Sequence, residues 1–150
     1  MSTSKVQEMP FPSYGAGLIL SLVRGEGAAA GRLIPMILEG LPMAELADLR
    51  EVLDLPMERV AARVGMSRAT FHRRQKSGVL STDESDKALR LARILAQAVG
   101  VLGGMTEARA WLSAPQRGLG GAVPLDYAAT EVGAREVENL LGRIDYGVYA

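Results

Sequence analysis

Residues 57–76 read MERVAARVGMSRATFHRRQK, and this segment has the pattern of two short helices joined at a tight turn. A helix-turn-helix needs a small residue where its helices cross and a glycine with positive φ at the turn. Ala61 and Gly65, four residues apart, fit these two positions. The apolar residues that we expect to form the small core between the helices are Val60, Val64, Met66 and Phe71. Because alanine and glycine often occur at this spacing by chance, the spacing alone does not establish the motif.

The same segment carries an uneven share of the charge. The whole chain of 150 residues has 17 basic and 17 acidic side chains. Residues 59–93 nevertheless hold nine basic side chains against three acidic ones, and residues 59–80 hold six basic side chains and no acid. A solvated helical face would usually interleave both signs, whereas a block of one sign is typical of a surface that binds a polyanion. The charge pattern therefore favours a phosphate-bearing partner.

The second helix of the motif, predicted at 68–77, is the candidate DNA-reading element. In this geometry its N-terminal part meets base edges in the major groove. Arginine can donate two hydrogen bonds to guanine, and hydroxyl groups suit phosphate or base contacts. The predicted DNA-binding residues are Ser67, Arg68, Thr70, His72, Arg73 and Lys76. Arg74 stands where an apolar residue often closes the hairpin, and we expect its stem to pack while its charged head reaches solvent.

The rest of the chain also predicts helices. Aromatic residues make up only 5% of the sequence, which favours an all-α fold over an aromatic-rich β-sandwich. The helix 82–102 has a deeply apolar stripe, so we expect it to be the central core helix. The stripe consists of Leu91, Ile94/Leu95, Ala98 and Leu102. We expect residues 1–14 to be a mobile arm and residues 146–150 a C-terminal tail. Apolar spacing and turn residues predict the other helices at 18–23, 32–39, 42–53, 56–64, 106–114, 125–130 and 134–144.

Several kinds of chemistry are disfavoured by the residues present. Without cysteine there is no disulfide, thiolate metal site or cysteine nucleophile, and the single histidine, His72, lacks a second metal ligand. Asp83, Glu84 and Asp86 resemble paired catalytic carboxylates, but a helix N-terminus explains them. Residues 119–121 lack the Lys-Ser/Thr pair of a phosphate loop. We therefore expect no catalytic residue, metal or cofactor. Since no segment approaches the roughly 20 apolar residues of a membrane span, we predict a soluble cytoplasmic protein.

Two sets of residues carry a family resemblance that covers about residues 40–150. The N-terminal set resembles the Xre-type antitoxins of bacterial RES–Xre toxin–antitoxin pairs. It comprises Gly65 through Arg74, Gly78, Leu80-Ser81 and Glu84-Ser85-Asp86. The C-terminal set is similar to the toxin-binding domain of the same family. It comprises Ala110-Trp111-Leu112, Pro115, Leu119-Gly120-Gly121, Pro124-Leu125-Asp126, Thr130-Glu131, Gly133-Ala134 and Leu141 through Gly147.

The resemblance implies a protein with two functions. A helix-turn-helix DNA-binding domain at 40–103 would repress the chain's own operon at an inverted repeat. A toxin-binding domain at 104–150 would neutralise a RES-domain toxin by direct binding near its active site, and residues 1–39 would form an arm with short helices. RES toxins degrade NAD, so that chemistry would belong to the partner and this chain would be no enzyme. Because such motifs usually read DNA in pairs, we predict a homodimer, with the helix 82–102 and the glycine-rich N-terminal segments as candidate contact surfaces.

The C-terminal end supplies candidate toxin contacts. Two of the four tyrosines, Tyr146 and Tyr149, fall in the last five residues, and tyrosine is a favoured interface anchor. We hypothesise that Asp145, Tyr146, Val148 and Tyr149 reach the toxin's catalytic cleft; alternatively, the two rings fold back onto the chain's own helices. Further toxin-binding candidates lie in the segments that carry the resemblance, and they are Trp111, Leu119, Asp126 and Arg143. A position in the core is the alternative for Trp111.

Two other functions compete with the antitoxin hypothesis. The chain is alternatively a stand-alone helix-turn-helix transcription regulator whose C-terminal half dimerises or binds a small ligand. A small helical enzyme is the third possibility, and the absence of cysteine and of a second histidine disfavours it.

Overall fold

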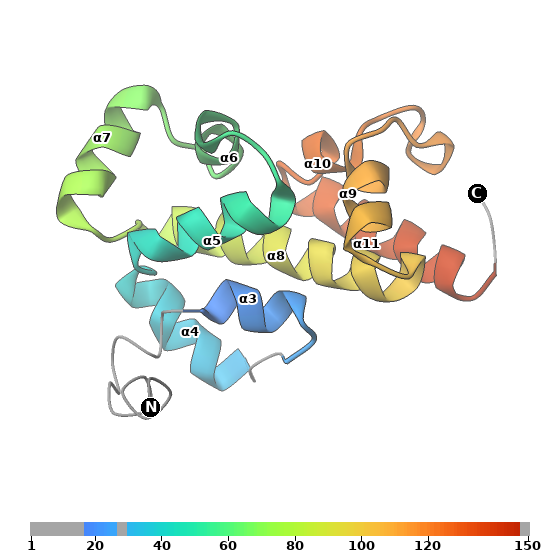
Figure 1. The fold of residues 1–150 in the computed structure, drawn as a ribbon, viewed down its shortest axis with the longest axis horizontal. Helices are drawn as coiled ribbons and strands as arrows, with labels where there is room; N and C mark the ends of the chain where they lie inside the picture. Colours follow the sequence, from blue (N-terminus) through green and yellow to red (C-terminus); the bar gives the residue numbers. More distant parts are fainter. Residues whose placement is uncertain (1–16, 27–29, 148–150) are drawn as a thin grey trace.

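The computed structural model describes residues 17–26 and 30–147, and within these residues the chain forms nine α-helices, one short 3-10 helix and no strand (Figure 1). The predicted all-α fold is confirmed. The predicted arm at 1–14 lies outside the described residues, as do Val148 and Tyr149 of the tail. In chain order the elements are α3 (Leu18–Val23), α4 (Ala30–Glu39), α5 (Met43–Leu53), α6 (Met57–Arg63), α7 (Arg68–Ser77), α8 (Thr82–Leu102), α9 (Met105–Leu112), η1 (Arg117–Leu119), α10 (Pro124–Tyr127) and α11 (Glu131–Asp145).

Most differences from the predicted boundaries have a local cause. α11 begins at Glu131, three residues earlier than predicted, because the Thr130 side chain caps it by accepting a hydrogen bond of 3.0 Å from the Gly133 amide. Pro42 and Pro56 precede α5 and α6 and are not their first residues, since both have extended backbone with ψ of 147° and 149°. α9 and α10 are also shorter than predicted. The long helix α8 has the predicted bounds.

α8 is the central core helix. It runs through the middle of the molecule, with α3, α4 and α5 beside its N-terminal half and α9 and α11 against its C-terminal half (Figure 1). The predicted stripe along it is buried at Leu91, Ile94, Leu95 and Ala98, whereas Leu102 is half-buried. A capping box between Ser81 and Glu84 starts the helix. Both halves of the chain therefore share one core that is built around α8.

The central position of α8 corrects one expectation. We predicted that this helix would supply a contact surface for a second copy of the chain. Its apolar residues instead pack against other helices of the same chain, and its exposed positions are polar or glycine. The exposed positions are Thr82, Asp83, Asp86, Arg93 and Gly100. A surface of this kind lacks the apolar area that a stable dimer interface needs.

Three arginines join the N-terminal and C-terminal helices. The Arg63 guanidinium on α6 lies 3.0 Å from the Asp126 carboxylate on α10. Arg109 on α9 donates hydrogen bonds of 2.7 and 3.3 Å to the carbonyl groups of Val52 and Glu51 at the end of α5. The third, on α8, is Arg90, which lies 3.6 Å from Glu131. These contacts hold α9 and α10 against α5 and α6, which precede α8, and hold α11 against α8 itself.

A buried carboxylate attaches α3 to the core. Glu45 is fully buried and accepts hydrogen bonds of 3.1 and 3.0 Å from the backbone amides of Leu18 and Ile19. Burial raises the pKa of the Glu45 carboxyl, although the two amides oppose that effect. Four of the five apolar residues of α3 are buried against α5 and α8, and the fifth, Leu20, is half-buried. α3 is therefore an integral part of the core.

Among the described residues, no single helix is long and apolar enough to cross a membrane; only α8 and α9 taken together reach that length and composition, and they are bent by 118°.

Candidate nucleic-acid and partner interfaces

The predicted helix-turn-helix is present in α6 and α7. Gly65 has a φ of +88° at the turn between them, and Ala61 is buried where the helices cross. The small core forms as predicted at Val60, Val64 and Met66, which are all buried. Phe71 is only half-buried, which differs from the prediction. It packs against the core and also lines an open groove of about 620 Å³ between α6 and α7.

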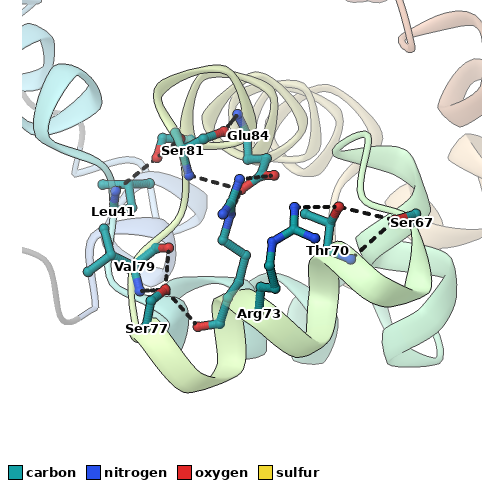
Figure 2. Close-up of polar contacts among 10 residues, drawn as sticks. Leu41, Ser67, Thr70, Arg73, Ser77, Val79, Ser81 and Glu84 are labelled. Carbon is teal, nitrogen blue, oxygen red and sulfur yellow. Dashed lines mark hydrogen bonds and ion pairs between the residues drawn. The ribbon is translucent and has the colours of Figure 1, made fainter.

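The first turn of α7 is held by a small hydroxyl network. The Ser67 hydroxyl accepts a hydrogen bond of 3.1 Å from the Thr70 amide and so caps the helix. Ser67 also donates a bond of 3.0 Å to the Thr70 hydroxyl, which accepts a further bond of 3.3 Å from Arg73 (Figure 2). Because Thr70 accepts both bonds, its own hydroxyl hydrogen can be donated to a phosphate oxygen. The network also restricts the side chain of Arg73 at the surface.

The structure places all six predicted DNA-binding residues on α7 and its cap. Thr70 is half-buried. The other five are exposed, and they are Ser67, Arg68, His72, Arg73 and Lys76. This arrangement presents hydroxyl groups, guanidinium groups and an ammonium group along one short helix, which is the chemistry that phosphates and guanine edges require.

Arg74 corrects a second expectation. Its head does not extend freely into solvent but pairs with Glu84: its Nε and Nη2 atoms donate hydrogen bonds of 2.7 and 3.1 Å to the two carboxylate oxygens of Glu84 on α8, and the Arg74 side chain is 25% exposed. Glu84 is buried, and it also accepts a bond of 2.9 Å from the Ser81 amide (Figure 2). Burial raises the pKa of Glu84, but Arg74 and Ser81 outweigh it, so the net shift is downward. Sequence reasoning assigned Glu84 only to the start of its helix.

The folded chain neutralises part of the basic block. Of the six cations at 59–80, Arg63 pairs with Asp126 and Arg74 pairs with Glu84. The remaining four are exposed and form no ion pair within residues 17–26 and 30–147, and they are Arg59, Arg68, Arg73 and Lys76. Acids outside the basic segment, one of them on α10, thus select which cations stay available for a polyanion.

The described residues contain no group of three or more histidine, cysteine or acidic side chains that is suited to a metal ion.

The C-terminal candidate residues do not form one cluster. Asp126 lies just before α11 and Tyr146 directly after it, and 15 helical residues separate them by about 22 Å. Asp126 is exposed and paired with Arg63, while Tyr146 is 86% exposed. The remaining placements are Trp111 half-buried against the core, Leu119 buried, Arg143 half-buried and Asp145 exposed. Leu119 therefore contributes to packing beneath η1 and does not itself form part of the surface.

Two exposed apolar side chains near the start of α11 were missed by sequence reasoning. Val132 is 74% exposed and Tyr127 is 40% exposed. A signal for Val132 was present, because it lies off the apolar stripe of α11 that faces the core. That stripe consists of Val137, Leu140, Leu141 and Ile144. Exposed apolar groups of this kind are typical of a surface that a partner covers.

Comparison with known proteins matches both halves of the chain. Residues 32–93 match the family model of the antitoxin Xre-like helix-turn-helix domain. Residues 96–147 match that of the antitoxin Xre/MbcA/ParS C-terminal toxin-binding domain.

Three relatives, each named antitoxin Xre, are similar to the chain. The one from Yersinia enterocolitica is 31% identical over 135 residues, which cover 87% of this chain and 91% of the relative. The one from Photorhabdus laumondii is 31% identical over 73% of this chain and 76% of the relative. The one from Pseudomonas putida is 38% identical over 45% of this chain and 43% of the relative.

Proposed function

Because this chain belongs to the Xre antitoxin family, with a helix-turn-helix domain and a toxin-binding domain, we propose that it neutralises a RES-domain toxin and represses its own operon. In this proposal residues 40–103 bind an inverted-repeat operator and residues 104–150 bind the toxin near its active site. NAD degradation is the toxin's activity, and the chain itself catalyses nothing. Both proposed partners, DNA and an NAD-consuming enzyme, place this function in the bacterial cytoplasm.

The DNA-binding half of the proposal is supported by the exposed cations of the recognition helix. Arg68 and Arg73 lie within two turns of the start of α7, which is the part that enters the major groove. Ser67, Thr70, His72 and Lys76 surround them and would supply the phosphate contacts.

Alanine substitution tests this assignment. If an arginine reads a guanine, Arg68→Ala or Arg73→Ala should weaken operator binding by about 1–3 kcal/mol and relax preference at one base pair. If it contacts only phosphate, affinity should fall equally on all duplexes and the salt slope should become shallower by about one. Arg117→Ala, which removes an exposed arginine from η1, is the matched control and should change neither. Unchanged binding in both α7 variants would contradict the assignment of α7.

The toxin-binding half of the proposal centres on the end of α11. Tyr146 carries an apolar ring that the chain itself leaves 86% exposed, and Asp145 is exposed beside it. An unsupported aromatic ring at the end of a helix suits insertion into a partner's pocket. We therefore assign the main toxin contacts to Asp145, Tyr146, Val148 and Tyr149, with Arg143, Trp111 and Asp126 as supporting positions. Leu119, which is buried, would support this surface only through packing.

A truncation tests the toxin contact. A chain ending at residue 145 should stay folded and bind operator DNA, yet lose the ability to block NAD loss when it is co-expressed with the toxin. Tyr146→Ala should weaken the complex by roughly 2 kcal/mol or more if the ring is an interface anchor. Tyr127→Ala makes the same change near the other end of α11, and its effect shows whether the exposed apolar side chains there also contact the toxin. Full neutralisation by the truncated chain would instead place the contact between residues 111 and 126.

We further propose a homodimer, because two recognition helices about 34 Å apart are needed to read an inverted repeat. α4 is the favoured contact surface, since Ile34 and Leu38 lie one turn apart on it and are 53% and 66% exposed. Sedimentation of the wild type and of Leu38→Glu, with and without operator DNA, tests this assignment. A wild-type monomer under both conditions would contradict it.

A further inference from the structure

The recognition helix α7 is weakly packed against the rest of the chain. None of its ten residues is buried, whereas the shorter α6 beside it buries Val60 and Ala61. Phe71, the largest apolar residue of α7, is only half-buried. Since hydrophobic packing fixes the orientation of most helices in proteins, α7 depends on other contacts to hold its orientation.

Polar contacts attach α7 at three places. At its start, Ser67 caps the helix within the motif itself. After its end, the Gly78 carbonyl accepts a hydrogen bond of 2.8 Å from the Met43 amide. Between them, Arg74 binds Glu84, and among the described residues this is the only side-chain hydrogen bonding that joins α7 to another helix. The two end contacts determine where α7 begins and ends, but they leave its rotation and tilt open.

The Glu84 carboxylate is itself held firmly. It is 6% exposed and belongs to the first turn of α8, the core helix. The Ser81 amide and Arg74 both donate to its Oε1 atom, while Arg74 also donates to Oε2 (Figure 2). A bidentate pair between an arginine and a carboxylate constrains direction as well as distance. Arg73 and Arg74 are consecutive residues of α7. The contact between Arg74 and Glu84 therefore also determines how Arg73 lies on the exposed side of the helix.

We propose that Glu84 is a positioning residue for DNA recognition, which holds α7 in its reading orientation through the bidentate contact with Arg74. This inference rests on the proposed DNA-binding function. The proposed role can be separated from a simple effect of charge, because removing an acid near a DNA-binding surface by itself strengthens DNA binding. Loss of the contact between Arg74 and Glu84 should instead weaken DNA binding, and only to a duplex whose bases α7 recognises.

Glu84→Gln separates the two effects. A glutamine at this position can still accept the hydrogen bond from the Ser81 amide, so the capping box of α8 is retained. It loses one carboxylate acceptor and turns amide hydrogens towards the Arg74 guanidinium. Asp83→Asn is the matched control: it removes the same charge one residue earlier, where the carboxylate pairs with Lys87 at 2.8 Å on α8 itself and does not contact α7.

Two measurements test the proposal. The first is hydrogen exchange of the α7 amides without DNA, which should be about tenfold faster in Glu84→Gln and unchanged in Asp83→Asn. The second is binding to a duplex from the promoter region upstream of the chain's own gene and to a scrambled duplex of equal length. Glu84→Gln should bind the promoter duplex about tenfold more weakly, the loss expected for one charge-assisted hydrogen bond. Its affinity for the scrambled duplex should be unchanged or slightly higher.

The outcomes separate this inference from the proposed function. Equal exchange and an equal promoter-to-scrambled ratio in Glu84→Gln and Asp83→Asn would overturn the inference. If Glu84→Gln does not fold, the double variant Arg74→Met/Glu84→Gln leaves no buried unpaired charge. Loss of promoter preference in that folded variant supports the inference, and a wild-type preference overturns it. A wild-type chain without promoter preference would contradict the proposed operator binding. Hydrogen exchange of the α7 amides would still decide whether Glu84 holds the helix.

Discussion

Gly133 and Gly142 lie on the same helix, α11, yet the structure predicts opposite effects when each is changed to alanine. A methyl group at Gly133 would overlap the carbonyl oxygen of Tyr127 and come within 2.8 Å of the carbonyl carbon. It would also lie 3.1 Å from the Thr130 hydroxyl that caps the helix. At Gly142 no atom of the described residues, apart from the chain neighbours and the nearby backbone of α11 itself, lies within 4 Å of the added carbon. Gly133 is therefore required for the close approach of α10, whereas Gly142 is not.

The magnitudes follow from these contacts. Overpacking against backbone costs about 1–3 kcal/mol, and disturbing the Thr130 cap costs about 0.5–2 kcal/mol. Alanine recovers about 1 kcal/mol of helix propensity, so the net cost lies between about 0.5 and 4 kcal/mol. Because the overlap at Gly133 is with backbone, which cannot move aside as a flexible side chain can, we expect Gly133→Ala to destabilise the chain by about 2–3 kcal/mol. Gly142→Ala keeps only the propensity gain of about 0.5–1 kcal/mol.

Thermal unfolding followed by circular dichroism measures both effects at a fixed protein concentration. For a chain of this size 1 kcal/mol corresponds to about 2–4 °C in Tm. Gly133→Ala should lower Tm by about 4–12 °C, and Gly142→Ala should raise it by about 1–4 °C. A rise in Tm for both variants would show that α10 moves aside without cost, and a fall for both would show that alanine is also unfavourable at position 142; either result would refute the reasoning.

Three further predictions concern polar contacts within the fold. Glu45→Gln should destabilise the chain by about 1–3 kcal/mol in urea unfolding. The glutamine side chain has a single acceptor oxygen, whereas the backbone amides of Leu18 and Ile19 donate to two separate carboxylate oxygens of Glu45. Arg109→Met keeps the apolar stem but removes the donors to the Val52 region, and should lower stability by about 1–2 kcal/mol; an unchanged urea midpoint would contradict this. Burial raises the pKa of the Glu84 carboxyl, but the contact with Arg74 lowers it more, so the pKa in the folded chain is below its ordinary value. The ionised carboxylate therefore stabilises the fold fully above the ordinary pKa, and this stabilisation is lost as the pH falls through the lowered pKa. Between about pH 5 and pH 3 the wild type should therefore lose more stability than Glu84→Gln, and parallel pH curves would contradict the assignment.

Much of the local architecture followed from the sequence. The bounds of α8 were predictable because a serine cap and an acidic first turn stand at one end and a glycine pair at the other. The turn at Gly65 was predictable because only glycine adopts positive φ without strain. The start of α11 was placed three residues late, since the cap at Thr130 was overlooked. In each case the deciding chemistry lies within a few residues of the element that it determines.

The binding surfaces could not be predicted to the same extent. The sequence shows six cations without an acid at 59–80, but only the packed structure shows that Asp126 and Glu84 neutralise two of them. Likewise, the position of Val132 off the apolar stripe of α11 indicates that it is exposed, but only the packed structure brings the exposed Tyr127 of α10 near the start of the same helix.

The sequence by itself therefore determined the helices, the motif and the family to which the chain belongs, because capping, glycine conformation and apolar spacing act over a few residues. Only the tertiary structure decided which charges stay free and what holds α7. An ion pair such as that between Arg63 and Asp126 forms only when packing brings together two side chains that are distant in the sequence, to 3.0 Å in this case.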